Sequence, residues 1–180
     1  MPGLATQTAL TVVLAGLGLY FLVLVIRALA GYLRFVRLRA TAVLTWPVRR
    51  PAHFPLLLGL GVLALGVAVL NGRMNRPLHH VASQVLIAVY FILVVPLATR
   101  IRLGLYRDGV WADAGFLPYA EIARMAFVEG HEVVLVMLAR GRGSAFRLPL
   151  PAGEYGAVRK VIEEKIRSHA LTVDSAILGL

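Results

Sequence analysis

Acidic side chains are missing from the first 107 positions of this 180-residue chain, although the same stretch carries eleven arginines. All nine Asp and Glu residues lie at or after Asp108, and there they face eight Arg and Lys residues, so the last part of the chain is close to neutral. The positive excess therefore lies beside long apolar runs, where basic side chains typically meet anionic lipid headgroups. We expect anionic lipids as partners and no nucleic acid, because a nucleic-acid interface needs its basic patch on the soluble domain.

Cysteine is absent altogether. This absence excludes disulfide bonds, thiolate metal sites, iron–sulfur clusters and cysteine nucleophiles. The first ten residues also lack any basic side chain, whereas a secretory signal peptide begins with a basic segment. The first apolar stretch is therefore predicted to be a retained membrane span.

Three apolar stretches are long enough to cross a bilayer. They cover about residues 8–26, 54–71 and 81–99 and contain no charged side chain. A helix rises about 1.5 Å per residue and the hydrocarbon core is about 30 Å thick, so each stretch can span it. The runs are continuously apolar rather than alternating, which predicts helices and not barrel strands. Residues 1–100 are thus expected to form a three-helix transmembrane domain.

The arginines predict the orientation of these spans. The first connection, residues 27–53, holds six arginines, the second holds two, three follow the third span, and the N-terminal tail has none. Because Arg and Lys favour the cytoplasmic side, the N-terminus is expected outside, and the first connection and the C-terminal domain inside.

The first connection combines basic with apolar residues and a tryptophan. This composition is typical of a helix lying at the headgroups, and an equally good interpretation is that the first span simply extends past the membrane. In either case the segment is expected to contact lipid. The residues expected at this interface are Arg34, Arg37, Arg39, Trp46, Arg49 and Arg50.

Small residues recur at helical spacing in the first two spans. Because lipid offers no hydrophobic drive for helix association, such faces predict close backbone packing, either within this chain or with another subunit. The residues are Thr11, Ala15 and Gly18 in the first span, and Gly61, Ala64 and Ala68 in the second.

Ionisable side chains are absent from the interior of the spans, which argues against ion or proton transport by this chain. His79 and His80 lie at the outer mouth of the third span. Adjacent helical residues point about 100° apart and make a poor chelating pair, so solvated imidazoles are favoured over a pigment or metal ligand shared with a partner. We expect no cofactor.

From residue 101 onward the sequence changes to short strand signals separated by turns. Five or six antiparallel strands are predicted up to Leu150, and they include the continuous apolar run Val133–Leu138, which is typical of a buried strand. Residues 152–169 then show the apolar stripe of an amphipathic helix. The predicted fold is an α-helical membrane domain followed by a small α+β domain, residues 101–170, and a tail, residues 171–180, that either binds a partner or is disordered.

Three segments of this domain resemble bacterial pleckstrin-homology-like (PH-like) domains carried by small membrane proteins: Gly104–Val110, Leu117–Ile122 and Phe146–Pro151. The resemblance covers about residues 101–169. It implies a PH-like fold closed by the last helix, a location in the bacterial inner membrane, and no shared catalytic residues. Photosynthetic-complex assembly proteins with three spans and such a domain are one relative that the resemblance suggests.

Catalytic motifs are not found. Ser144 and Ser168 lack a nucleophile elbow, and Gly141–Ser144 lacks the lysine of a phosphate loop. We therefore expect a non-catalytic accessory or scaffold subunit of a respiratory or photosynthetic membrane complex, with other membrane subunits as partners. The alternative is a separate lipid or signal sensor that uses Arg140 and Arg142.

Overall fold

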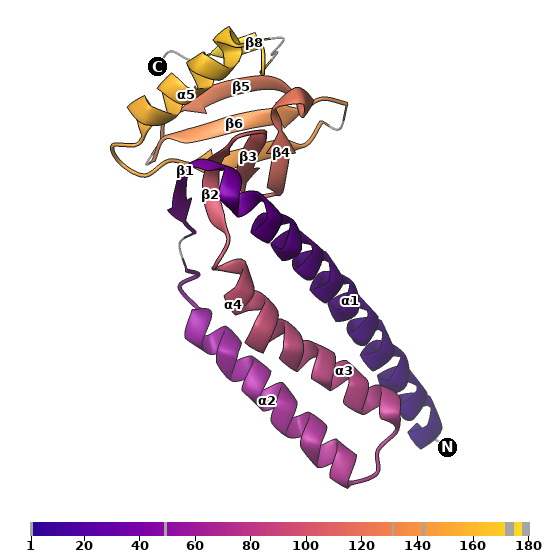
Figure 1. The fold of residues 1–180 in the computed structure, drawn as a ribbon. Helices are drawn as coiled ribbons and strands as arrows, with labels where there is room; N and C mark the ends of the chain where they lie inside the picture. Colours follow the sequence, from indigo (N-terminus) through magenta and orange to yellow (C-terminus); the bar gives the residue numbers. More distant parts are fainter. Residues whose placement is uncertain (1, 49, 131, 142, 172–174, 178–180) are drawn as a thin grey trace. The chain divides into compact units, whose positions relative to one another are not determined.

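The computed structural model describes all residues except 1, 49, 131, 142, 172–174 and 178–180. The chain divides into two units, residues 1–34 with 49–101, and residues 35–48 with 102–180. We call them the span unit and the soluble unit (Figure 1). Neither unit is continuous in the sequence, because the chain enters the soluble unit, leaves it and returns.

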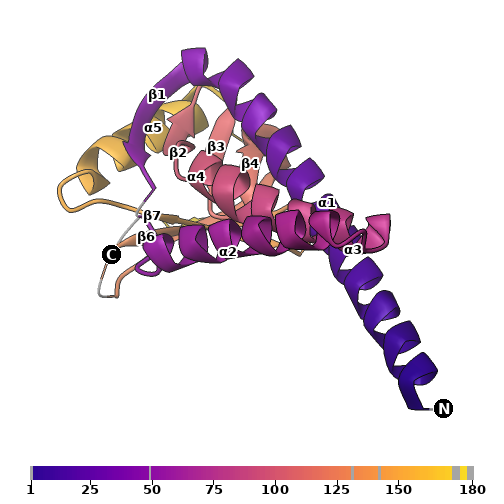
Figure 2. The ribbon, with the colours of Figure 1, turned by 90° about the horizontal axis from the view of Figure 1, so that it is seen from below.

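Three long apolar helical segments make up the span unit. They are α1 (Pro2–Leu38), α2 (Phe54–Arg73) and a third segment composed of α3 (Leu78–Val89), the π-helical turn η2 (Tyr90–Val94) and α4 (Val95–Ala98). Each is long and apolar enough to cross a membrane, which indicates a multi-pass membrane protein. Figure 2 shows α2 and α3 side by side, as in Figure 1.

Pro96 explains why the third segment is not a regular α-helix. A proline inside a helix has no N–H to donate, and its ring collides with the carbonyl of the residue four positions earlier, here Ile92. The turn before it widens, and the Val95 N–H bonds the Tyr90 carbonyl five residues back. Such local π adjustments keep backbone groups bonded where no water is available.

The first connection does not form a headgroup helix throughout. Its first part continues α1 to Leu38, as the extension alternative expects, and then residues Ala42–Pro47 form a strand, β1. The expected domain boundary at residue 100 therefore changes, because residues 35–48 belong to the soluble unit. The physical reason is that β1 completes a sheet with a strand beginning at Arg102, a pairing too distant in sequence for a local pattern to indicate.

Strand β1 pairs antiparallel with β2 (Arg102–Tyr106), from Pro47 opposite Arg102 to Ala42 opposite Tyr106. Gly104 allows this approach: its φ is +140°, and a side chain there would collide with the Leu44 carbonyl. Paired strands lie about 5 Å apart. The two strands therefore lie on one side of any membrane that α2 and the third segment cross.

The remaining strands form two four-stranded sheets. The first has the order β1-β2-β3-β4 and the second the order β7-β6-β5-β8, and all pairs are antiparallel except β5 with β8. Helix α5 (Tyr155–Arg167) follows β7. The bounds are β3 Gly109–Ala112, β4 Gly115–Pro118, β5 Ile122–Val128, β6 Val134–Ala139, β7 Ala145–Pro149 and β8 Ser175–Ile177.

The core of the soluble unit is aromatic and aliphatic. Tyr106, Trp111 and Tyr119 are buried, and the end of α1 contributes Phe35, whose ring packs edge-on at 5.7 Å from that of Trp111. The Tyr119 hydroxyl donates to the Tyr106 carbonyl at 3.0 Å. Further side-chain bonds join separate elements, so the core is fixed by hydrogen bonds as well as packing.

Two of these bonds join the sheets. The Trp46 indole N–H donates to the Pro149 carbonyl at 3.1 Å, which ties β1 to β7. Asp113 Oδ1 accepts the Arg147 N–H at 2.8 Å, while the Asp113 N–H donates to the Arg147 carbonyl. Trp46, expected as a lipid-facing residue, is therefore a buried residue of the soluble unit.

A cross-link tests the β1–β2 pairing, and the absence of native cysteine makes it specific. We expect Pro47→Cys combined with Arg102→Cys to form a disulfide in the full chain, because both residues are exposed and directly paired. With a protease site inserted after Asn75, between α2 and α3, the cleaved halves should stay joined on a non-reducing gel.

The matched control is Pro47→Cys with Arg107→Cys. Arg107 follows β2 and lies five residues from Arg102, about 16 Å along an extended strand, so no direct bond should form. Separation of the halves in both double variants would show that β1 does not pair with β2.

Alkaline pH tests the buried tyrosines. Burial raises the pKa of the Tyr106 hydroxyl to about 12, partly offset by Arg102, and burial together with the Asp108 charge raises that of Tyr119. Both phenols titrate near pH 10 when unfolded, so the folded state binds more protons above that pH. Stability should be fully present below about pH 10 and fall as the pH rises toward 12.

The measurement is urea unfolding of the full chain in detergent, followed by tryptophan fluorescence. Both tryptophans, Trp46 and Trp111, lie in the soluble unit and report on it alone. Tyr106→Phe should lower stability at neutral pH, because its hydroxyl no longer donates to the Arg102 carbonyl, and it should weaken the alkaline loss. An unchanged alkaline loss in this variant would contradict the assignment.

Candidate functional site

The spans contact one another through the small residues of the first two. Gly18 of α1 lies against Ser83 of α3, so closely that an added Cβ would stand 2.5 Å from the Ser83 hydroxyl oxygen. Ser83 is itself buried, and its hydroxyl donates to the His79 carbonyl at 2.8 Å. A larger residue at position 18 has no room, so the glycine permits this helix contact.

Gly61 plays the corresponding role in α2. An added Cβ would stand 2.7 Å from Ile92 Cγ1 and 2.9 Å from Phe91 Cβ, both in the π-helical turn. Ala68 of α2 and Ala88 of α3 are also buried. The turn that Pro96 imposes thus meets a glycine on the neighbouring span.

The two small-residue faces were expected to pack tightly, either within this chain or against another subunit. The structure places their contacts within the chain, and each described contact is to the third segment rather than between the first two. Not every expected residue takes part: Ala15 is exposed, and Ala64 is only partly buried.

Polar side chains join the three spans at the end that contains the α2–α3 turn. Asn71 donates to Gln84 Oε1 at 3.1 Å, and the Thr11 hydroxyl lies 3.4 Å from His80 Nε2. Together with Ser83, these groups form a polar layer that connects α1, α2 and α3. Hydrogen bonds of this kind hold spans together, each worth about 0.6 kcal/mol on average.

His79 and His80 differ in burial and in their contacts. His80 is half-buried and faces Thr11, whereas His79 is exposed and its ring meets that of His80 edge-on at 4.4 Å. Among the described residues, no three His, Cys, Asp or Glu side chains gather as metal ligands.

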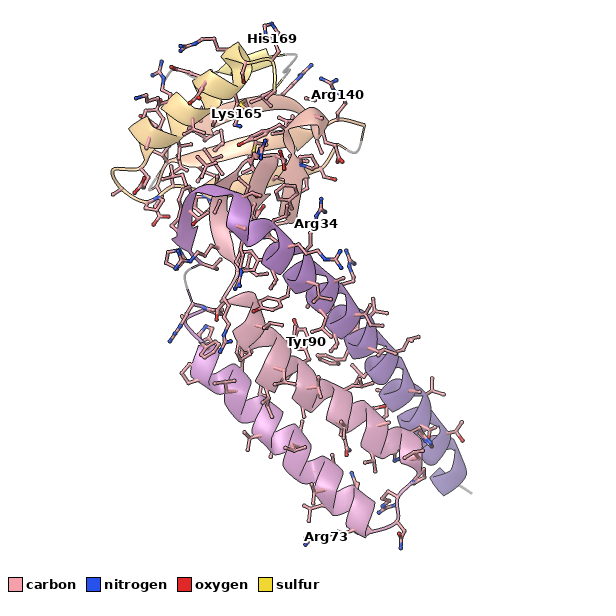
Figure 3. The ribbon with its side chains drawn as sticks, viewed as in Figure 1. Arg34, Arg73, Tyr90, Arg140, Lys165 and His169 are labelled. Carbon is pink, nitrogen blue, oxygen red and sulfur yellow. The ribbon has the colours of Figure 1, made fainter. Side chains whose placement is uncertain are left out.

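An aromatic cluster fills the space between α1 and the π-helical turn. The Phe21 ring lies 5.2 Å from Tyr90 and 5.9 Å from Phe91, both in tilted or edge-on geometry. Figure 3 labels Tyr90. Such ring pairs contribute about 0.5–1.5 kcal/mol beyond their buried area. The cluster thus adds an aromatic contact between the first and third spans.

The arginines expected at lipid are placed as follows. Arg34 and Arg37 are exposed on α1, Arg39 is exposed in the 3-10 turn after it, and Arg50 is exposed and lies over the Phe54 ring at 5.9 Å. Arg49 lies outside the described residues. Exposed guanidinium groups can reach lipid headgroups, and the contact of these arginines with lipid stays a prediction.

Of the two arginines of the sensor alternative, Arg140 lies in the turn that follows β6. Arg140 is exposed there (Figure 3), and its N–H donates to the Glu121 carbonyl. Arg142 lies outside the described residues. One exposed arginine in a turn is a weak signal for a specific headgroup site.

Sequence reasoning missed the bonds between sheets and the Asn71–Gln84 pair. A tryptophan after an arginine-rich segment indicates an interface as readily as a core, and Asn71 stands at the end of an apolar run. A second polar residue at the facing end of the next span is the signal that could have predicted their bond.

Comparisons with protein families, with characterised proteins and with solved structures found no match to this chain.

Two glycines in α2 provide a matched test of the span packing. Gly61→Ala should destabilise the chain by about 1–3 kcal/mol, because the methyl group must displace Ile92 and Phe91. Gly66→Ala should be neutral or stabilise by up to about 1 kcal/mol, because nothing lies within 4 Å and alanine favours the helix. The readout is the fraction of dodecyl sulfate at which helicity is lost in mixed micelles; equal effects at both sites would contradict the contact.

Proposed function

We propose that this chain is a non-catalytic accessory or scaffold subunit of a larger membrane complex, respiratory or photosynthetic, in a bacterial inner membrane. One observation carries the proposal: every described buried polar side chain already has a hydrogen-bond partner within the fold. Catalytic and transport sites hold polar groups poised for a substrate. Here Ser83, Trp46, Tyr106 and Tyr119 bond backbone carbonyls and serve the fold itself.

The outer sides of the spans supply surface for partner subunits. Exposed apolar side chains cover α1 and α2 away from their contacts with the third segment, and Leu29 and Leu33 continue this surface past the expected span into the basic extension. Lipid covers such a surface inside the bilayer, but it covers the extension less well. A neighbouring helix of another subunit would bury both parts.

The soluble unit is proposed to be PH-like. Its support is the element order: four antiparallel strands β1–β4, three antiparallel strands β5–β7 in a second sheet, and helix α5. Strand β8, which follows α5 and pairs parallel with β5, is an addition to this pattern. The buried Val158 and Ile162 of α5 supply the apolar stripe expected of such a helix. With β1, the proposed PH-like unit also includes Ala42–Pro47, which lie outside the residues 101–169 covered by the resemblance.

The soluble unit is proposed to face the cytoplasm. The pairing of β1 with β2 supports a common side for the arginine-rich first connection and the C-terminal domain, and nine of the eleven arginines among residues 1–107 belong to the first connection or follow the third span. The positive-inside rule then makes this side cytoplasmic.

Purification from native membranes in mild detergent tests the proposal. We expect the full chain to elute in a particle much larger than its own 19.5 kDa plus micelle, with partner subunits in fixed ratio and an absorption spectrum that identifies haem or photosynthetic pigment. Deleting the chain should weaken this assembly without abolishing one specific reaction.

A chain that elutes alone, from membranes whose complexes are unchanged by its deletion, would contradict the proposal. That outcome would favour the lipid sensor. Arg140→Glu with Arg142→Glu should then abolish binding to anionic vesicles while leaving tryptophan fluorescence unchanged.

A further inference from the structure

Strand β6 is apolar on both of its faces. Val134 to Ala139 contains no polar residue, a pattern typical of strands that are covered from both sides. In the structure Leu135, Met137 and Ala139 are buried, but the alternating residues Val134 and Val136 are only partly covered. The sequence of β6 is therefore that of a strand covered on both faces, whereas the described residues cover only one of them.

The neighbouring strands continue this uncovered face. Strand register places Val128 and Pro149 beside Val134, Ala126 and Arg147 beside Val136, and Arg124 and Ala145 beside Leu138. We call this three-stranded surface the outer sheet face. Its residues are Arg124, Ala126, Val128, Val134, Val136, Leu138, Ala145, Arg147 and Pro149.

Helix α5 packs on the opposite face of this sheet. The Tyr155 ring lies 4.9 Å from Phe127, whose neighbours Ala126 and Val128 point to the outer side. On that outer side Val128 is 49% exposed and Leu138 is 37% exposed. A contiguous apolar surface of this kind on a soluble domain marks an interaction site more often than a scattered apolar residue does.

The charge of the outer sheet face is of one sign. Arg124 and Arg147 are exposed on it, and no Lys, Asp or Glu shares the nine positions. The residues from 108 onward are nearly neutral as a whole, so this separation of charge is local. Protein interfaces are enriched in arginine and depleted in lysine and acidic residues, and the outer sheet face shares these features.

We infer that the outer sheet face is a docking surface for a partner subunit that presents an apolar patch with carboxylates placed to meet Arg124 and Arg147. Guanidinium groups pair carboxylates in bidentate geometry, which sets the register of the contact as well as its energy. This inference rests on the proposed role as an accessory subunit and assigns the surface through which its soluble unit binds.

A protein fits this surface better than a bilayer does. Membrane-inserting surfaces carry long apolar or aromatic side chains such as Trp, Phe and Leu, which reach past the headgroups. The apolar residues of the outer sheet face are instead mainly valine, alanine and proline, with Leu138 as the one long aliphatic side chain. β-Branched side chains fit a pleated, half-buried surface, as one covered by another protein would be.

Thiol labelling locates the contact in the native complex. Val136→Cys introduces the chain's single thiol at the centre of the face, and Ala157→Cys on the exposed side of α5 is its matched control. Labelling of Val136→Cys by a maleimide should be roughly tenfold or more slower in the complex than in the separated chain, because packed interfaces exclude reagent. Ala157→Cys should react equally in both.

Charge reversal tests the role of the arginines. Arg124→Glu with Arg147→Glu should remove the partner subunits from the purified particle while leaving tryptophan fluorescence and helicity unchanged. Lys160→Glu with Arg167→Glu changes the net charge equally on exposed α5 positions and should retain the partners.

The outcomes separate this inference from the proposed function. A wild-type chain without partners overturns both. A wild-type complex in which Val136→Cys reacts at full rate, or in which the Arg124 and Arg147 reversals keep every partner, overturns the docking face alone. Protection of Val136→Cys by phosphatidylglycerol vesicles without any partner would assign the face to the bilayer instead.

Discussion

The pairing of β1 with β2 is the constraint on which the rest of the soluble unit depends. The two strands are neighbours in a sheet, but residues 48–101, with two membrane spans, separate them in the chain. Joining the ends of so long a segment costs conformational entropy unless something else brings them together. The antiparallel packing of α2 on the third segment does so, because a helical hairpin returns the chain to the side from which it left. The membrane hairpin therefore reduces the entropy cost of completing the sheet, and Gly104 leaves the space in which β1 can lie.

The span unit is held by contacts that do not require water. Gly18 and Gly61 permit close approach to the third segment, and the Asn71–Gln84 bond and the Thr11–His80 contact join the three spans at one end. Pro96 breaks the helical ladder where Phe91 and Ile92 meet Gly61. Pro96, the π-helical turn and Gly61 therefore depend on one another, because the widened turn packs only against a neighbour without a side chain.

The described polar groups and apolar faces differ in whether the fold itself supplies their contacts. Among the described residues, the buried polar side chains are hydrogen-bonded within the fold, as Trp46 is between β1 and β7. The surfaces that no other part of the described chain covers are apolar: the outer sides of α1 and α2, and the outer sheet face around Val136. In the part of the chain that the structure describes, the buried polar groups are bonded while apolar faces remain open, and this combination is the basis of the proposed scaffold role.

Much of this organisation could be predicted locally. Continuous apolar runs predicted the three long helical segments, and alternation with Gly turns predicted β2 to β7 and α5 to within a few residues, because these patterns depend on neighbours in the chain. Strands β1 and β8 were not predicted: Ser175–Ile177, expected to bind a partner or to be disordered as part of the tail, instead pair parallel with β5. Long-range contacts could not be predicted in this way. The same Trp46 fits a lipid interface or a core, the same Gly61 fits any helix contact, and the apolar run of β6 predicts burial without saying which face is covered. Only the tertiary structure decided that β1 belongs to the soluble sheet, that both small-residue faces meet the third span, and that one face of β6 stays open, because each depends on which distant segments come into contact.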